Sequence, residues 1–305
     1  MEREGHWDLY RDGFTQGLLA KWLNCRESVY IAYVQGLEKP SLSAPLFYGS
    51  LVHGVLEKHY NGDCRKLTIL VDEVVNEIHP VGFVNTFEDY VALAEVVLAE
   101  YMRFYKHEDR KFKWIQTEHQ FDIPYKLPSG AESRMRGMID GVFTQKGKVW
   151  LLETKTASMV NESVLMDRLS FDMQIGFYLN VVRQMIKRTP AGVVYNILRK
   201  PLLRKSVKEN ERAYIERCRR DIASRPDWYF IRYEIRVTKR EQQRWIREFN
   251  DILADLEEWF QGRGHYRNSG NCDGKYGSCP YLPICSSGNT NGFSQRPHVF
   301  AELET

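Results

Sequence analysis

The stretch RMRGMIDGVFTQKGKVWLLETKTAS, residues 134–158, decides how the chain folds. Two runs rich in apolar and β-branched residues flank the turn signal QKGK, a pattern that predicts a β-hairpin. Asp140 follows the apolar residues of the first run, and Glu153 and Lys155 follow those of the second. Because side chains alternate along a strand, Glu153 and Lys155 project to the same face. A hairpin of this length brings Asp140 near Glu153, so two carboxylates and one ammonium meet at one end of a sheet.

These three side chains have the chemistry of a phosphodiester-cleaving site. Carboxylate oxygens are the ligands that Mg²⁺ and Mn²⁺ prefer. A neighbouring lysine can orient the attacking water, help to deprotonate it, or stabilise charge on a phosphate. An ordinary ion pair on the exposed face of an edge hairpin is the alternative that these residues leave open.

Helical and strand-like patterns surround the hairpin on both sides. Apolar spacing predicts helices over residues 10–36, 45–60, 87–109, 170–187, 206–223 and 240–260. Runs of β-branched and aromatic residues predict strands over 114–127, 133–145, 148–157, 191–199 and 228–238. Strands that alternate with helices on a mixed sheet predict an α/β fold.

Composition limits the classes of protein to which the chain can belong. Its 305 residues are 43% hydrophobic, enough for a sizeable core, and the formal net charge of +3 does not by itself indicate a polyanionic partner. No apolar run approaches the roughly 20 residues that cross a bilayer, and the charged N-terminal segment lacks the apolar core of a signal peptide. We therefore expect a cytoplasmic protein that does not interact with a membrane. No phosphate-binding loop of the Walker type is present, so ATP is not implied.

Two pairs of polar residues at helical spacing extend the candidate site. His53 and Glu57 lie four residues apart in one predicted helix, and Gln174 and Tyr178 lie four apart in another. Residues at this spacing share a helical face, so each pair can reach a common site. A lone helical histidine is more often a surface or core residue, but these pairs gain weight beside the hairpin carboxylates.

The order of these motifs resembles the PD-(D/E)XK nuclease superfamily, in its RecB/AddB-like branch. The resemblance covers about residues 45–180. Its motifs are Gly-x-x-x-His in a helix, from Gly49 to His53, then GMIDG, then LLETKT, then Gln-x-x-x-Tyr. It implies a restriction-endonuclease-like core, with a mixed central β-sheet flanked by helices. The third motif is Glu-Thr-Lys where many relatives have Asp-x-Lys, a variation that the family pattern permits.

The resemblance also implies a role for each motif residue. The metal ligands are His53, Asp140 and Glu153, which bind Mg²⁺ or Mn²⁺, and Lys155 assists catalysis together with Asp140 and Glu153. Gln174 and Tyr178 shape the site and contact DNA. Separately from the resemblance, Arg136 is a basic residue next to the second motif, and we expect it to contact phosphates. Glu57 and Glu118 remain open, with an exposed strand position as the alternative for Glu118.

Three cysteines crowd the C-terminal segment NCDGKYGSCPYLPICSSG at positions 272, 279 and 285. This segment is rich in Gly, Pro, Asn and Ser and has too few apolar residues to fold by burial alone. Three thiolates at these intervals suit zinc or an iron–sulfur cluster, and Cys25 is the candidate fourth ligand. The residues leave open that Cys25 is a small buried hydrophobic residue and that His265 completes the set.

The family resemblance extends to these cysteines. Nucleases of the AddB type and the CRISPR-associated Cas-four exonucleases carry one cysteine before the nuclease motifs and three after them, and these bind a [4Fe–4S] cluster. By this resemblance Cys25, Cys272, Cys279 and Cys285 bind such a cluster. The six residues between Cys272 and Cys279, where relatives usually have two, keep Zn²⁺ as the alternative.

We therefore predict a metal-dependent deoxyribonuclease, an exonuclease on single-stranded DNA ends rather than an endonuclease. By resemblance it acts in recombination, repair or spacer acquisition, with a helicase or recombination protein as partner. The predicted domains are a nuclease domain over 1–261 and a cysteine-rich extension over 262–305 that packs on the N-terminal helix. The rival hypothesis is a DNA-binding or assembly subunit with this fold and little or no cleavage.

Overall fold

The structure is a computed structural model that describes residues 5–39, 43–78, 84–262, 264, 266–274, 277–300 and 303. The chain forms two compact units. Unit 1 comprises residues 1–41, 120–138 and 243–305, and unit 2 comprises residues 42–119 and 139–242. The predicted division at residue 261 stays a prediction.

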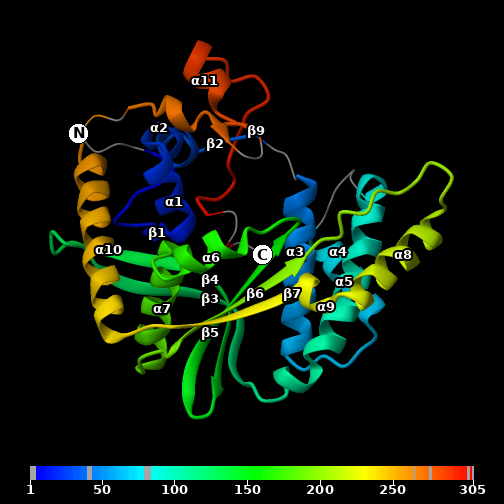
Figure 1. Cartoon of the computed structure of the whole chain (residues 1–305). Helices are drawn as coiled ribbons and strands as arrows, with labels where there is room; N and C mark the ends of the chain where they lie inside the picture. Colours follow the sequence, from blue (N-terminus) through cyan, green and yellow to red (C-terminus); the bar gives the residue numbers. More distant parts are fainter. Residues whose placement is uncertain are drawn as a thin grey trace. The chain divides into compact units, whose positions relative to one another are not determined.

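Unit 2 contains most of the regular structure (Figure 1). Its helices are α3 (Ala44–Tyr60), α4 (Leu67–Ile78), α5 (Val84–Asp109), α6 (Glu162–Leu169), α7 (Met173–Ile186), α8 (Glu211–Ser224) and α9 (Pro226–Tyr229). Its strands are β5 (Lys148–Ala157), β6 (Gly192–Arg199) and β7 (Phe230–Arg236), with parts of β3 (Lys113–Lys126) and β4 (Glu132–Gln145).

The central sheet is mixed, as predicted. Strands follow the order β1-β4-β5-β6-β7, with β3 paired to β4. β4 and β5 form the predicted antiparallel hairpin, β5 runs parallel to β6, and β6 is antiparallel to β7. The parallel pair needs a helical crossover, and α6 and α7 supply it, with α7 packed on both strands. The predicted α/β fold is therefore confirmed.

The core of unit 2 lies between its sheet and the helices α3, α4 and α5, which contact one another (Figure 1). Each of these helices presents buried apolar residues at helical spacing, such as Leu51, Val55 and Val97. They pack against Leu152 of β5 and Val194 of β6, which are neighbours across the parallel pair. The packed side of α3 fixes the orientation of this helix, and so the direction in which its polar side chains project.

Unit 1 joins the beginning and the end of the chain. Its elements are β1 (Phe14–Thr15), α1 (Gln16–Asn24), α2 (Arg26–Val29), the π-helix η1 (Tyr30–Val34), β2 (Leu37–Glu38), most of α10 (Lys239–Phe260), η2 (Ser269–Asn271), β8 (Asp273–Gly274), β9 (Gly277–Ser278), α11 (Leu282–Ser287) and β10 (Ser294–Gln295). β1 pairs in parallel with β4, and β10 pairs with β2.

Two predicted helices differ from the structure. The helix expected over 10–36 begins at Gln16 and is interrupted at Cys25, whose extended backbone (φ −162°, ψ 114°) separates α1 from α2. The helix expected over 170–187 is α7 alone, because Asp172 caps its N-terminus and separates it from α6. Within the described part of the chain, every helix is too short or too polar to span a lipid bilayer.

Candidate metal centre

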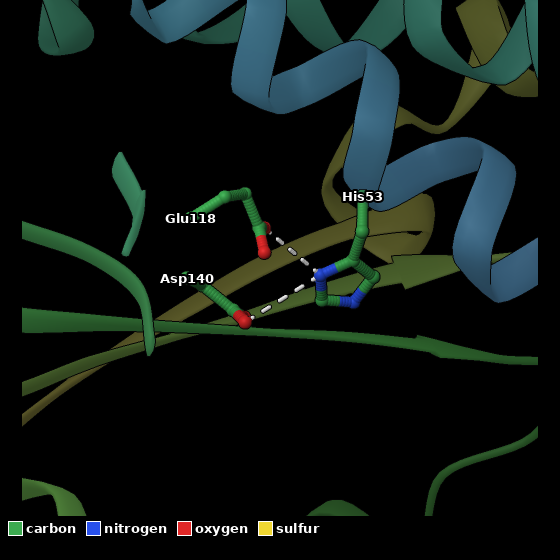
Figure 2. A group of neighbouring side chains, drawn as sticks. All are labelled: His53, Glu118 and Asp140. Atoms are coloured by element: carbon green, nitrogen blue, oxygen red, sulfur yellow. Dashed lines mark hydrogen bonds and ion pairs between the residues drawn. The ribbon is translucent and has the colours of Figure 1, made fainter. Parts of the chain in front are cut away.

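Three polar side chains from separate segments of unit 2 converge on one point (Figure 2). His53 comes from α3, Glu118 from β3 and Asp140 from β4. The Nδ1 atom of His53 lies 3.3 Å from Oε1 of Glu118 and 3.5 Å from Oδ1 of Asp140. One ligand atom from each residue lies within 4.8 Å of the others, close enough for all three to bind one ion. We call these residues the ligand triad.

Local structure orients each member of the ligand triad. α3 begins at a Ser43 cap and buries Val52 and Val55, so that His53 projects from its partly exposed side. Asp140 precedes Gly141, where a Cβ atom would lie 2.8 Å from the ring of Trp114. Glycine therefore lets this ring pack against β4 at the residue that follows Asp140.

Glu118 has an unusual backbone conformation for a strand residue. Its φ angle of +36° lies in the left-handed region, which costs a residue with a side chain roughly 1–2 kcal/mol. The carboxylate is 11% exposed and contacts His53. A single left-handed residue turns the side chain out of the regular alternation of the strand. The strain is therefore located where it directs Glu118 toward the other two ligands, as is common at functional sites.

Asp140 is held by the main chain of the neighbouring strand. Its Oδ2 atom accepts a hydrogen bond of 2.5 Å from the backbone N–H of Thr154. Burial raises the pKa of Asp140, but the charge and hydrogen bond of His53, the charge of Lys155 and this N–H outweigh burial and hold the pKa below its ordinary value. Asp140 is therefore an anion at neutral pH.

The pKa values of His53 and Glu118 reflect their contact. Burial lowers the pKa of His53, but Asp140 and Glu118 outweigh it and raise the pKa well above its ordinary value. Burial raises the pKa of Glu118 to about 7, with the charge of Asp140 adding to the effect and the hydrogen bond from His53 opposing it. Without a cation the triad therefore holds a proton on His53 that a metal ligand must release.

Glu153 and Lys155 lie beside the ligand triad as an ion pair. The Nζ atom of Lys155 is 2.5 Å from Oε1 of Glu153, whose side chain is only 1% exposed. Burial and the charge of Asp140 raise the pKa of Glu153 to about 7, against the opposing charge of Lys155. The other oxygen, Oε2, is buried and has no hydrogen-bond partner among the described residues. A buried, unpartnered carboxylate oxygen beside three further ligands is what a cation site requires.

The residue set fits a hard divalent cation. Carboxylate oxygens with one imidazole suit Mg²⁺ or Mn²⁺, whereas the softer metals favour thiolates. The predicted ligands were His53, Asp140 and Glu153; the structure groups His53 and Asp140 with Glu118 and places Glu153 next to this group. Glu57 has a raised pKa owing to burial and is not a member of the triad.

Gln174 and Tyr178 both lie on α7, whose first turn is capped by Asp172. Burial and the charge of Glu153 raise the pKa of Tyr178, and a hydrogen bond with Gln174 lowers it. Tyr178 therefore lies near Glu153, with Gln174 as its hydrogen-bond partner, and the predicted DNA contact of the pair stays a prediction. Tyr195 of β6, which sequence reasoning missed, is the strand neighbour of Glu153, and its pKa is raised to about 12 by burial, against the opposing charge of Lys155.

Sequence reasoning also left Glu118 open, because an isolated glutamate in a strand-like run carries no signal of its own. The one available hint is its position, on the strand preceding the one that carries Asp140. Arg136 belongs to unit 1, where its guanidinium lies 3.0 Å from Asp122, which also binds Arg134. Its predicted DNA contact stays a prediction.

The four predicted cysteines gather in unit 1. The backbone N–H of Asn268 lies 3.5 Å from Sγ of Cys25, and the N–H of Cys279 donates to the carbonyl of Cys272. Burial raises the pKa of Cys285, and nearby charges on Glu27 and on the other three cysteines raise it further.

The spacing of the cysteine sulfurs differs from that around a single ion. Among the described residues, no three of these sulfurs lie within 4.8 Å of one another. Four thiolates that bind one zinc, with each zinc–sulfur distance about 2.3 Å, have all their sulfurs within 4.8 Å of one another. His265, the alternative fourth ligand, lies outside the described residues.

Comparison with known proteins places the fold in a family. The family model described as the PD-(D/E)XK nuclease superfamily matches residues 14–286. A solved structure from Eubacterium rectale, named as a candidate exonuclease, is 13% identical, with 85% of each chain covered and a TM-score of 0.51. A second solved structure, SSO0001, is 13% identical over 84% of this chain and 90% of its own, but at a TM-score of 0.31 it carries no argument.

No curated protein matches the sequence significantly. The likeness to the Eubacterium rectale protein, at 13% identity, concerns the fold alone. The family model, in contrast, spans most of the chain, including every motif of the site. The chain therefore belongs to the PD-(D/E)XK nuclease superfamily.

Proposed function

We propose that this protein is a divalent-metal-dependent deoxyribonuclease that degrades single-stranded DNA from its ends. One observation carries the proposal: the ligand triad lies beside a buried glutamate with an unpartnered oxygen and beside an ammonium group. An ordinary surface ion pair explains neither the unpartnered oxygen nor the strained backbone at Glu118.

Within this proposal, His53, Glu118, Asp140 and Glu153 hold the cation. A divalent ion bound there supplies positive charge that stabilises the scissile phosphate as negative charge develops in the transition state. The backbone N–H of Thr154 fixes Asp140, and the charge of Asp140 favours the protonated form of His53. To serve as a ligand of the cation, His53 would have to give up that proton.

Lys155 acts as an ammonium group in this mechanism. Partial burial lowers its pKa, but the charges of Glu153 and Asp140 outweigh burial and hold the pKa above its ordinary value. Lys155 therefore donates hydrogen bonds and charge rather than accepting a proton. In hydrolysis the water oxygen bonds to phosphorus and gives up a proton to solvent, the bond from phosphorus to the leaving oxygen breaks, and the leaving oxygen takes up a proton from solvent. Within the proposal, the ammonium of Lys155 orients the water or the phosphate; its ion pair with Glu153 supports this role.

The preference for single-stranded ends belongs to the proposal and has two supports. The motif order resembles the RecB/AddB-like branch, and the structurally similar protein from Eubacterium rectale is named as a candidate exonuclease. Within the proposal, Gln174 and Tyr178 on α7 contact the DNA strand; the closeness of Tyr178 to Glu153 supports this role. A role in recombination, repair or spacer acquisition, with a helicase or recombination protein as partner, follows from the same resemblance.

The decisive experiment separates cleavage from binding. Wild-type protein with Mn²⁺ should shorten end-labelled single-stranded DNA. Glu153→Gln and Lys155→Ala should slow this shortening by at least about 100-fold while binding DNA normally. Asp72→Asn and Lys66→Ala, exposed substitutions of matched type, should cut like wild type. Wild-type protein that binds DNA but cuts it with neither Mg²⁺ nor Mn²⁺ would leave the alternative of a binding or assembly subunit.

We further propose that Cys25, Cys272, Cys279 and Cys285 hold a [4Fe–4S] cluster that fastens the extension over 262–305 to the N-terminal helix. In a cluster each thiolate binds a different iron, which requires wider sulfur spacing than a single zinc. Protein purified without oxygen should be brown and should contain iron and sulfide in equal amounts. Colourless protein with one zinc per chain would contradict the cluster and support the Zn²⁺ alternative.

A further inference from the structure

The start of β5, five residues before Glu153, borders a cavity of unit 2 whose charged lining residues are all cations. The cavity has a volume of about 420 Å³. Lys148, Arg188 and Arg236 line it, and Trp150 and other uncharged residues complete the lining. No carboxylate is among these lining residues. A concave surface with this lining favours an anion.

The backbone builds this cavity from three segments. The guanidinium of Arg188 donates a hydrogen bond of 2.8 Å to the carbonyl of Gly147 in the β4–β5 turn. Gly192, the first residue of β6, has φ +155°, and a Cβ atom there would lie 1.9 Å from the carbonyl oxygen of Ile235. Only glycine permits this approach, which brings the end of β7, and with it Arg236, beside the start of β6.

Much of the charge in the cavity is uncompensated. Lys148 and Arg188 form no ion pair with any described residue, and Arg236 is paired with the exposed Glu234 at 2.9 Å. An unpaired guanidinium that is already oriented by a backbone carbonyl presents its remaining donors in a fixed fork, which matches a phosphate group.

Two further lysines flank the cavity at positions that favour glycine or asparagine. Lys146 in the β4–β5 turn has φ +48°, and Lys187 at the end of α7 has φ +55°. A left-handed residue with a long side chain costs about 1 kcal/mol relative to glycine at such turn and cap positions. Lysine at both positions adds positive charge next to Lys148 and Arg188 at a cost to local stability, which points to a role for that charge.

We propose that this cavity and its flanking lysines bind the sugar–phosphate backbone of a nucleic-acid strand at a distance from the cleaved bond. The inference rests on the proposed nuclease function. At about 3.3 Å per strand residue, Lys148 lies about 17 Å along β5 from Glu153. This distance corresponds to about five nucleotides of a stacked strand. A polyanion with regularly repeated charges can reach both the cavity and the metal site, whereas a small anion would occupy only one of them.

The test removes the three lining cations by the triple substitution Lys148→Ser, Arg188→Ser and Arg236→Ser. The control variant removes three exposed cations elsewhere in unit 2, by Lys66→Ser, Lys106→Ser and Arg110→Ser. Binding of a long fluorescent single strand is measured in EDTA, so that cleavage plays no part. The cavity variant should bind at least 10-fold more weakly than the control, and its slope of log affinity against log salt should be smaller by about 2. Both variants should show wild-type circular dichroism and thermal unfolding.

A second measurement tests the distance. With Mn²⁺, the cavity variant should raise KM for the long strand and leave unchanged the cleavage of strands shorter than about five nucleotides, which cannot reach the cavity. Equal losses in the two variants would mean that only net charge matters, and this would overturn the proposal. A cavity variant that binds DNA normally but loses affinity for polyglutamate would also overturn it, in favour of an acidic protein segment. If the cavity variant binds DNA more weakly than the control variant but wild-type protein does not cleave DNA, the nuclease function fails while this site stands.

Discussion

Glu118→Gln gives the sharpest test of the ligand triad, because it should stabilise the metal-free protein and impair the metal-bound one. The pKa of Glu118 is about 7, against an ordinary value of 4.5, a difference of about 2.5 units. At 1.36 kcal/mol per unit, ionising this carboxyl in the folded protein costs about 3 kcal/mol. Because the pKa of Glu118 is raised in the folded protein, the contribution of this carboxyl to the free energy of unfolding is fully present below pH 4.5. It is lost as pH rises through 7.

At pH 8 in EDTA, glutamine removes the buried charge and should therefore raise the midpoint of thermal unfolding. A gain of 3 kcal/mol corresponds to roughly 5 °C for a chain of this size. With Mn²⁺ present, Glu118→Gln should instead unfold at a lower temperature than wild type. An ion that binds only the folded state stabilises it by RT ln(1 + [L]/Kd), and a lost ligand raises Kd by at least 10–100-fold.

Differential scanning calorimetry at pH 8, with EDTA and then with Mn²⁺, measures both effects. Asp72→Asn, an exposed carboxylate on α4, is the matched control and should leave both midpoints unchanged. Two results would refute the reasoning. One is a Glu118→Gln variant that is less stable than wild type in EDTA; the other is a Mn²⁺-induced shift as large as that of wild type.

Three further predictions follow from the site and the core. Lys155→Met should lower the rate of DNA cleavage by about 10²–10³-fold with little change in DNA affinity, as measured by single-turnover kinetics, because it removes only an electrostatic stabiliser. Mn²⁺ affinity measured by calorimetry should rise between pH 6 and 8, since Glu118 and Glu153, with pKa values of about 7, must lose protons to bind the ion; a flat profile would contradict both roles. Arg232→Met should cost about 3–5 kcal/mol in chemical unfolding, because it leaves the largely buried Asp109 carboxylate, 11% exposed and 2.5 Å from the guanidinium in wild type, without this counter-charge. The added substitution Asp109→Asn should restore much of this loss.

The sheet and the hairpin could be predicted from the sequence because their signals are local. Alternation in residues 148–157 places Glu153 and Lys155 on one face, and the turn signal at 145–148 sets the pairing of β4 with β5. The family resemblance, rather than any local pattern, predicted that His53 would approach Asp140. Their contact depends on how α3 packs, which is a long-range property of the core.

Glu118 and Cys25 show what the sequence could not supply. The left-handed backbone at Glu118 is stabilised by contacts with His53, a residue 65 positions away, so no local propensity predicts it. Helical spacing continues through residue 25, but the backbone there is extended. The side-chain amides of Asn268 and Asn271 both donate to the carbonyl of Asn24 at this break, and these partners come from the far end of the chain.

The hydrogen bond from Thr154 to Asp140 bears on how freely the motif can vary between species. The donor is the main chain, so the acid is held by a group that nineteen of the amino acids supply equally, and only proline lacks it. The Thr154 hydroxyl instead faces Asn196, in the interior of the unit. The side chain of residue 154 is therefore constrained by packing in the interior of the unit and not by the chemistry of the metal site. Searches for distant relatives should accordingly let that position drift among small and branched side chains while forbidding proline.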